Sequence, residues 1–121
     1  MDISEQKARA AKFVALHHGD DILVMANPWD VVSARLFHEL GFPALATTSG
    51  GVAFPYGHAD GENISREEMA AVVRRIADAV PVPVTADMEA GYGRSPEDVA
   101  LTVRMAIEAG AVGVNIEDGD K

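Results

Sequence analysis

Residues 84–118, VTADMEAGYGRSPEDVALTVRMAIEAGAVGVNIED, contain a helical pattern between two short apolar runs. The runs at 84–86 and 112–114 are predicted strands, and each is followed by acidic residues. Between them, Ser95 is placed to cap a helix that continues to about Gly110. A strand, a helix and a second strand in this order are typical of a βαβ unit, whose two strands are parallel.

The same alternation extends toward the amino terminus. Apolar runs at 22–25 and 44–47 predict two further strands. Helices are predicted at 4–16, 32–40 and 65–80, the last beginning at Ser65 with Glu68 three residues later. A long loop rich in glycine and proline is expected over 52–63. The sequence therefore predicts an α/β chain with four parallel strands, in an open sheet or in part of a barrel.

Composition limits what this chain can do. Its 121 residues, 48% of them hydrophobic, suffice for one domain with a buried core. The 19 acidic residues exceed the 10 Lys and Arg, giving a net charge of −9, so we expect no nucleic-acid partner. No apolar run approaches the roughly 20 residues of a membrane span, and we expect no membrane partner. With no cysteine and a polar, acidic first segment, the chain is expected to be cytoplasmic.

Chemically informative side chains follow all four predicted strands. The carboxyl ends of parallel strands meet at one edge of a sheet, where active sites of barrels and open α/β sheets are built. We therefore expect these residues to converge. They are Asn27, Trp29 and Asp30 after the first strand, Ser49, Gly50 and Gly51 after the second, Asp87 and Glu89 after the third, and Glu117 and Asp118 after the fourth.

Three of these acids form a candidate metal site. Asp87, Glu89 and Glu117 offer hard oxygen ligands with no cysteine or histidine beside them, which suits Mg²⁺ or Mn²⁺. Asp87 and Glu89 are strand-end residues at i and i+2, which point to the same side, so they can share one ion. The alternative is that these acids cap helices or lie solvated in loops, and for Asp118 we favour that alternative.

Three further features are candidates for substrate contacts. Ser49, Gly50 and Gly51 offer backbone N–H groups suited to a carboxylate or a developing oxyanion, although such a sequence is also common in ordinary turns. Asp60 lies in the long loop, which is a candidate lid, although a lone acid there is commonly solvated. Trp29, the only tryptophan, is expected to pack over a helix start, with a role in the substrate wall as the alternative.

Several of these segments, taken together, resemble one enzyme family. The sequence is similar to the isocitrate lyase/phosphoenolpyruvate mutase superfamily from about residue 20 to residue 118. The segments that carry the resemblance are NPWDVVSAR at 27–35, GFPA at 41–44, TSGG at 48–51, ADMEAGYG at 86–93 and NIED at 115–118.

The resemblance implies a (β/α)₈ TIM-type barrel and a Mg²⁺-dependent lyase. Such an enzyme cleaves or forms a C–C or P–C bond of a small 2-oxo or 2-hydroxy carboxylate through an enolpyruvate-like intermediate. By this resemblance, Asp87 is the principal metal-side carboxylate, and Glu89, Glu117 and Asp60 complete the metal shell mostly through water. Asp60 is also the candidate catalytic residue. The substrate carboxylate is bound by Ser49, Gly50 and Gly51, and Asn115 faces the substrate.

Two departures from the family pattern matter. Many members have a second Asp where this chain has Glu89, a longer side chain that favours contact through water. A full barrel needs about 250 residues and eight strands, so the chain is expected to cover the first four strands only. We thus expect one partial barrel domain over 1–121, with an amino-terminal helix in 1–19 and the first half of the barrel in 20–121.

A half barrel has open sheet edges and an uncovered apolar face, so we expect it to form homo-oligomers and to be inactive as a fragment. Within the enzyme interpretation, the oxaloacetate decarboxylase and phosphonopyruvate hydrolase branches stay open. One alternative is a non-catalytic half-barrel module that self-assembles or pairs with a complementary half. An open-sheet binder of anions or nucleotides is a further alternative, which the missing glycine-rich phosphate loop disfavours.

Overall fold

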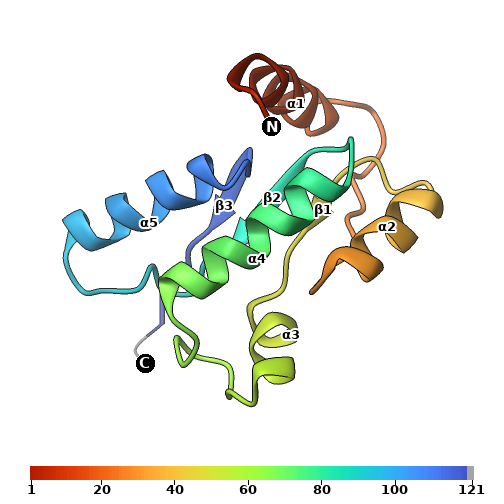
Figure 1. The fold of residues 1–121 in the computed structure, drawn as a ribbon. Helices are drawn as coiled ribbons and strands as arrows, with labels where there is room; N and C mark the ends of the chain where they lie inside the picture. Colours follow the sequence, from red (N-terminus) through yellow and green to blue (C-terminus); the bar gives the residue numbers. More distant parts are fainter. Residues whose placement is uncertain (120–121) are drawn as a thin grey trace.

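The computed structural model describes residues 1–119, which form a three-stranded sheet and the helices around it (Figure 1). Strands and helices alternate from β1 onward, as the βαβ pattern predicts. In chain order the elements are α1 (Ile3–Leu16), α2 (Val31–Glu39), β1 (Leu45–Ala46), α3 (Ser49–Ala53), the 3₁₀ helix η1 (Phe54–Tyr56), α4 (Arg66–Ala79), β2 (Val84–Asp87), α5 (Pro96–Glu108) and β3 (Gly113–Asn115).

The three strands are parallel and lie in the order β1-β2-β3. Leu45 pairs with Val84, and Asp87 at the end of β2 pairs with Asn115 at the end of β3. Helix α4 contacts β2, and it also contacts α2 on one side and α5 on the other. The buried core joins the apolar face of α4, through residues such as Met69 and Ile76, to the strands. This packing fixes the carboxyl ends of the strands at one edge.

Two predicted helix starts are confirmed in detail. Ser65 caps α4 by accepting from the Glu68 N–H, and the Glu68 side chain in turn accepts from the Ser65 N–H. Ser95 and Asp98 form the same reciprocal arrangement at the start of α5. Each pair satisfies backbone donors that a helix start leaves unpaired.

The predicted strand at 22–25 is wrong. The chain joins the sheet only at Ala26, which forms one isolated bridge with Leu45, and the Ala26 carbonyl accepts from the Ala46 N–H at 3.1 Å. Before that point Ile22 and Val24 are 89% and 61% exposed. Residues 22–25 pair with no strand of the described sheet, not even as an edge strand with a single neighbour. The described sheet therefore has three strands rather than the expected four.

The segment after β1 is also more regular than predicted. Residues 49–53 form α3 where a turn was expected, and η1 continues this helical path into the expected loop. The reason is local, because the Thr48 hydroxyl accepts from the Gly51 N–H at 3.3 Å and so caps α3. Gly57 then ends η1 with a left-handed φ of 79°.

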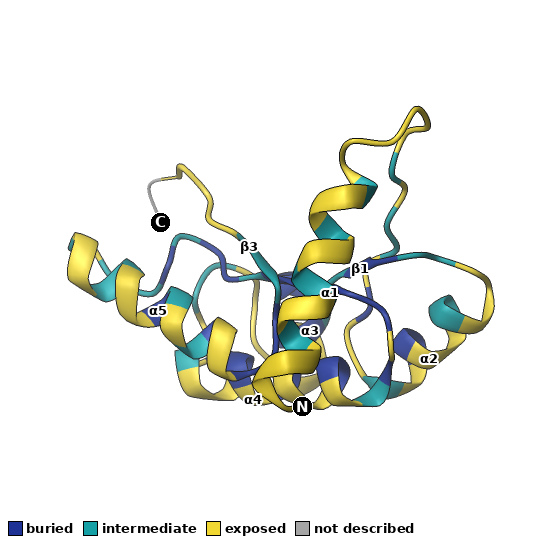
Figure 2. Ribbon diagram, turned by 90° about the horizontal axis from the view of Figure 1, so that it is seen from above, coloured by how far each residue is buried: buried dark blue, intermediate teal, exposed yellow. Residues whose placement is uncertain are grey.

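Helix α1 lies where the sequence predicts a helix, and polar side chains on it bond to the body. None of its residues is buried (Figure 2). Gln6 donates to the carbonyls of Ile107 and Ala111 near the end of α5, at 2.7 and 2.9 Å. Arg9 donates to carbonyls at the end of α4. In the part of the chain that the structure describes, no helix is long and apolar enough to cross a membrane.

Candidate functional site

The candidate site is centred on Asp87, the last residue of β2. Its Oδ2 accepts from both the backbone N–H and the hydroxyl of Ser49, at 3.0 and 2.8 Å. Its own N–H donates to the hydroxyl of Thr47 at 2.9 Å. Because Ser49 begins α3, these bonds fasten the end of β2 to the chain that follows β1. The structure thus brings together two of the predicted strand ends through direct contacts.

Two glycines at the start of α3 allow neighbouring groups to approach closely. A Cβ atom on Gly50 would lie 3.3 Å from the carboxyl carbon of Asp60, so that carboxyl group rests beside Gly50. A Cβ atom on Gly51 would lie 2.6 Å from the Thr48 methyl group and 3.1 Å from Trp29 Cβ. The positions predicted as ligands of a carboxylate are therefore packed against Asp60 on one side and Trp29 on the other.

Glu89 is fully buried, although its side chain is ionisable. One carboxylate oxygen accepts from the Glu62 N–H, and the other accepts from the Tyr92 hydroxyl at 3.4 Å. The Glu89 backbone N–H donates to Asp87 Oδ1 at 3.2 Å. Strand β2 has already ended and Glu89 has φ 52°, so the simple alternation of a strand does not hold here. That Asp87 and Glu89 share one ion stays a prediction.

Glu62 and Tyr92 belong to this cluster, and the sequence analysis missed both. The Glu62 carboxylate accepts from the Tyr92 N–H at 2.6 Å. Burial raises the pKa of the Tyr92 phenol well above its ordinary value of 10.0, and the neighbouring carboxylates of Glu89 and Glu62 raise it further. The phenol therefore stays protonated at neutral pH and acts as a hydrogen-bond donor. The only signal in the sequence was the Gly-Tyr-Gly turn after the strand.

The remaining candidates lie at the rim. Asn115 and Glu117 are exposed, and their backbones join the cluster because the Met88 N–H donates to the Asn115 carbonyl at 3.1 Å and the Glu117 N–H donates to the Glu89 carbonyl at 2.6 Å. Trp29 packs edge-on against Phe37 of α2, with ring centroids 6.4 Å apart, as expected for a side chain over a helix start.

The oxygen-rich donor set fits a hard cation held mainly by one carboxylate. Among residues 1–119, no three His, Asp or Glu side chains converge closely enough to hold a metal ion together. Mg²⁺ does not require such a cluster, because it keeps several waters and takes one or two protein carboxylates. Asp87 is half-buried, and its Oδ1 accepts only the longer bond from Glu89 while Oδ2 takes both bonds from Ser49. Oδ1 is thus the atom best placed to bind a cation directly.

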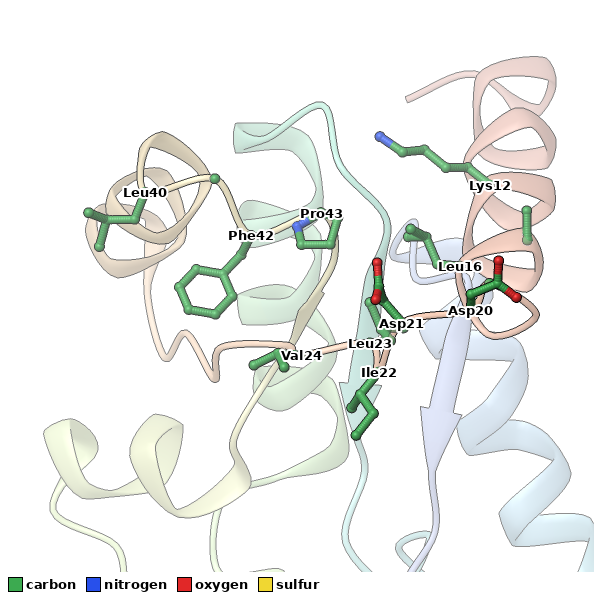
Figure 3. A pocket seen from close by; sticks show the side chains of 13 residues that line it. Lys12, Leu16, Asp20, Asp21, Ile22, Leu23, Val24, Leu40, Phe42 and Pro43 are labelled. Atoms are coloured by element: carbon green, nitrogen blue, oxygen red, sulfur yellow. The ribbon is translucent and has the colours of Figure 1, made fainter.

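Two cavities differ in their relation to these residues. One, of about 740 Å³, lies beside the loop after β2 and is lined by Glu62, Tyr92, Arg94 and Glu117 among others. The other, of about 620 Å³, lies between the end of α1 and the chain before β1 (Figure 3). Its lining residues include none of the site candidates. The first cavity therefore adjoins Glu62, Tyr92 and Glu117, whereas Asp87 and Ser49 are not among its lining residues.

A family model described as phosphoenolpyruvate phosphomutase matches residues 13–121. The chain belongs to this family. A crystal structure of a protein assigned as a lyase/mutase, from Burkholderia cenocepacia, is 45% identical, with a TM-score of 0.91 over 96% of this chain and 41% of that one. The family assignment and the barrel fold class predicted from the sequence are both confirmed, since the structural neighbours are TIM-barrel enzymes.

Curated relatives of this family member include a lyase and a decarboxylase. The 2-methylisocitrate lyase of Escherichia coli is 34% identical over 103 residues, which cover 79% of this chain and 35% of the relative. An oxaloacetate decarboxylase of Rhodopseudomonas palustris is 37% identical over 106 residues, covering 86% of this chain and 36% of the relative. The family comprises Mg²⁺-dependent lyases that act on small carboxylates. The chain spans about two fifths of the length of the relatives it matches.

Proposed function

We propose that this chain supplies the metal and carboxylate subsites of a Mg²⁺-dependent lyase that cleaves a C–C or P–C bond of a small 2-oxo or 2-hydroxy carboxylate. The observation that carries the proposal is the strand-end carboxylate of Asp87, held by the N–H and hydroxyl of Ser49. Membership of a family that includes 2-methylisocitrate lyase and oxaloacetate decarboxylase supports the reaction class. The relatives leave both of these branches open for the bond that is cleaved.

Within this proposal, the chain's own residues bind and orient the substrate. Asp87 would hold the cation directly, with Glu89, Glu117 and Asp60 contributing mostly through water. Bound Mg²⁺ would supply electrophilic stabilisation of the negative charge that develops on the substrate oxygen. The substrate carboxylate would bind at the start of α3, beside Gly50 and Gly51.

Ser49 has a specific part in this arrangement. Its two donors are given to Asp87 in the structure, and the Gly51 N–H is given to Thr48. We expect Ser49 to transfer at least one of these bonds to the incoming substrate carboxylate. Asp60, whose carboxyl group lies beside Gly50, would then face the bound carboxylate and is the candidate for proton transfer. Asn115, paired with Asp87 across β2 and β3, would contact the substrate from the next strand.

Calorimetric titration of Mn²⁺ with oxalate, a planar mimic of enolpyruvate, tests the proposal. We expect the wild-type protein to bind oxalate only with the metal present, and Asp87→Ala to bind neither. Glu108→Ala, which removes an exposed carboxylate on α5, is the matched control and should bind as the wild type does. Equal binding by wild type and Asp87→Ala would refute the assignment of Asp87.

Self-association is a second proposal with its own supporting observation. Large apolar side chains are exposed before, along and just after α2, including Ile22, Val32 and Leu40 at 89%, 74% and 67%. An uncovered apolar surface of this kind favours pairing with another chain, as in the half-barrel module considered above. Sedimentation velocity across a concentration series should show a dimer or larger species, and a monomer throughout would refute the proposal.

A further inference from the structure

Backbone strain gathers at three residues near the candidate site. Within the described part of the chain, the only residues other than glycine with positive φ are Glu62, Glu89 and Tyr92, at 59°, 52° and 58°. Left-handed φ is uncommon for side chains of this size and is energetically unfavourable at each position. Such a conformation persists only where surrounding contacts enforce it.

These three residues are bonded to one another in a closed ring. Glu62 donates its N–H to the Glu89 carboxylate, and its own carboxylate accepts from the Tyr92 N–H at 2.6 Å. The Tyr92 hydroxyl completes the ring by donating to the other oxygen of Glu89 at 3.4 Å. We call this set of three residues the glutamate clasp. Glu62 is its only member outside the loop that follows β2, so the clasp joins two loops that are far apart in the sequence.

Both sides of the clasp are fastened to the body of the protein. The Tyr92 carbonyl accepts from the Arg66 guanidinium in the first turn of α4, and the Gly91 carbonyl accepts from the Thr102 hydroxyl of α5 at 2.6 Å. On the other side, Asp60 lies two residues before Glu62 and rests against Gly50. A shift of Glu62 would therefore move the Asp60 loop and the Glu89 carboxylate together.

We infer that Glu62 is a positioning residue for the candidate site. It sets the orientation of the buried Glu89 carboxylate and keeps the Asp60 loop over the start of α3 by bonding its own loop to the loop after β2. Its carboxylate achieves this as a hydrogen-bond acceptor for the Tyr92 N–H rather than through its negative charge. The inference rests on the proposed function for its effect on ligand binding, whereas the clasp itself can be tested without any ligand.

Three variants separate position from charge and from stability. Glu62→Ala removes the acceptor, whereas Glu62→Gln removes the charge and keeps an acceptor oxygen. Glu68→Ala is the matched control, because Glu68 also accepts a backbone N–H, that of Ser65, but belongs to the α4 cap. Two quantities are measured: the affinity for Mn²⁺ with oxalate by calorimetry, and the hydrogen exchange rate of the Tyr92 amide by NMR without ligand.

We expect Glu62→Ala to weaken Mn²⁺–oxalate binding roughly 10–100-fold, the usual effect of losing a partner behind a metal ligand, and to speed exchange of the Tyr92 amide. Glu62→Gln should stay within about threefold of wild type in affinity, well below that 10–100-fold loss. Glu68→Ala should leave affinity unchanged. Binding by Glu62→Ala at wild-type affinity would overturn the inference, as would an equal loss in Glu62→Gln.

The two proposals fail in distinguishable ways. If the wild-type protein binds no Mn²⁺ with oxalate, the proposed function fails, and the exchange rate of the Tyr92 amide alone decides the clasp. An unchanged exchange rate of the Tyr92 amide in Glu62→Ala would then overturn the inference. Faster exchange in Glu62→Ala, together with a wild-type rate in Glu62→Gln, would support it.

Discussion

Replacing Ser49 with alanine tests whether the bond that holds Asp87 contributes to stability. Ser49 is 3% exposed, and its hydroxyl donates to a carboxylate oxygen at 2.8 Å. A hydrogen bond to a charged group contributes about 1.5–3 kcal/mol. The Ser49 N–H still holds the same oxygen in Ser49→Ala, so we expect a loss near the lower limit, about 1.5 kcal/mol. With a urea m-value of about 2 kcal/mol/M, the unfolding midpoint should fall by about 0.7 M.

The matched control is Ser4→Ala, because the Ser4 hydroxyl donates to an Asp2 oxygen at 2.7 Å but at an exposed helix start. Its midpoint should stay close to that of the wild type, since exposed charged groups remain solvated. A double-mutant cycle with Asp87→Ala should give a coupling energy of about 1.5 kcal/mol. A coupling energy near zero, or equal midpoint shifts in Ser49→Ala and Ser4→Ala, would refute the reasoning.

Three further predictions concern the loop after β2 and the helix that follows it. Gly91→Ala should lower the free energy of unfolding by about 1–3 kcal/mol, because Gly91 has φ 97° and an added Cβ would lie 2.9 Å from a Val99 methyl group; Gly19→Ala, with open space around it, should be neutral. The serine cap lowers the pKa of Asp98 below its ordinary value of 3.8. Near that pH the unfolded chain binds more protons than the folded chain. The contribution of Asp98 to stability is therefore fully present above the ordinary pKa and is lost as the pH falls through the folded-state pKa. In Asp98→Asn, the free energy of unfolding measured by urea titration should depend less on pH in this acidic range. The Tyr92 phenol, whose pKa is raised, should ionise only well above pH 10.0, and the free energy of unfolding should fall as pH rises past that value. The absorbance difference between wild type and Tyr92→Phe isolates this phenol from Tyr56, and urea titrations at several pH values measure the stability. A difference that titrates at the ordinary phenol pKa would contradict the prediction.

Much of the fold could be predicted because its signals are local. Capping residues and apolar periods fixed the helices at 65–80 and 95–110 to within a residue or two. The strand at 22–25 failed because an apolar run shows a preference for burial but does not show which chain will pair with it. Here the pairing begins only at Ala26, opposite Leu45. Whether an apolar run becomes a strand depends on the segment that lies beside it, and the run itself does not specify that segment.

The candidate site divides in the same way. The convergence of Asp87 with Ser49 followed from parallel strands, whose carboxyl ends meet at one edge. The contribution of Glu62 could not be predicted, because it depends on left-handed backbone conformations in two distant loops. Glutamate and tyrosine do not favour such conformations, so no propensity pointed to them. These contacts arise from tertiary structure and become visible only when both loops are placed.

The attachment of α1 has a consequence for how the molecule opens. Its hydrogen bonds to the body reach carbonyls at or just after the ends of α4 and α5, at the opposite end of the strands from Asp87. None of the residues of α1 is buried, so releasing this helix would expose less apolar surface than global unfolding and would depend less on denaturant. The rate of limited proteolysis within Ile3–Leu16 should therefore rise less steeply with urea than the rate of global unfolding does. The carboxyl ends of the strands would keep their geometry while α1 detaches. The amino-terminal edge of the sheet can therefore open locally without disturbing Asp87.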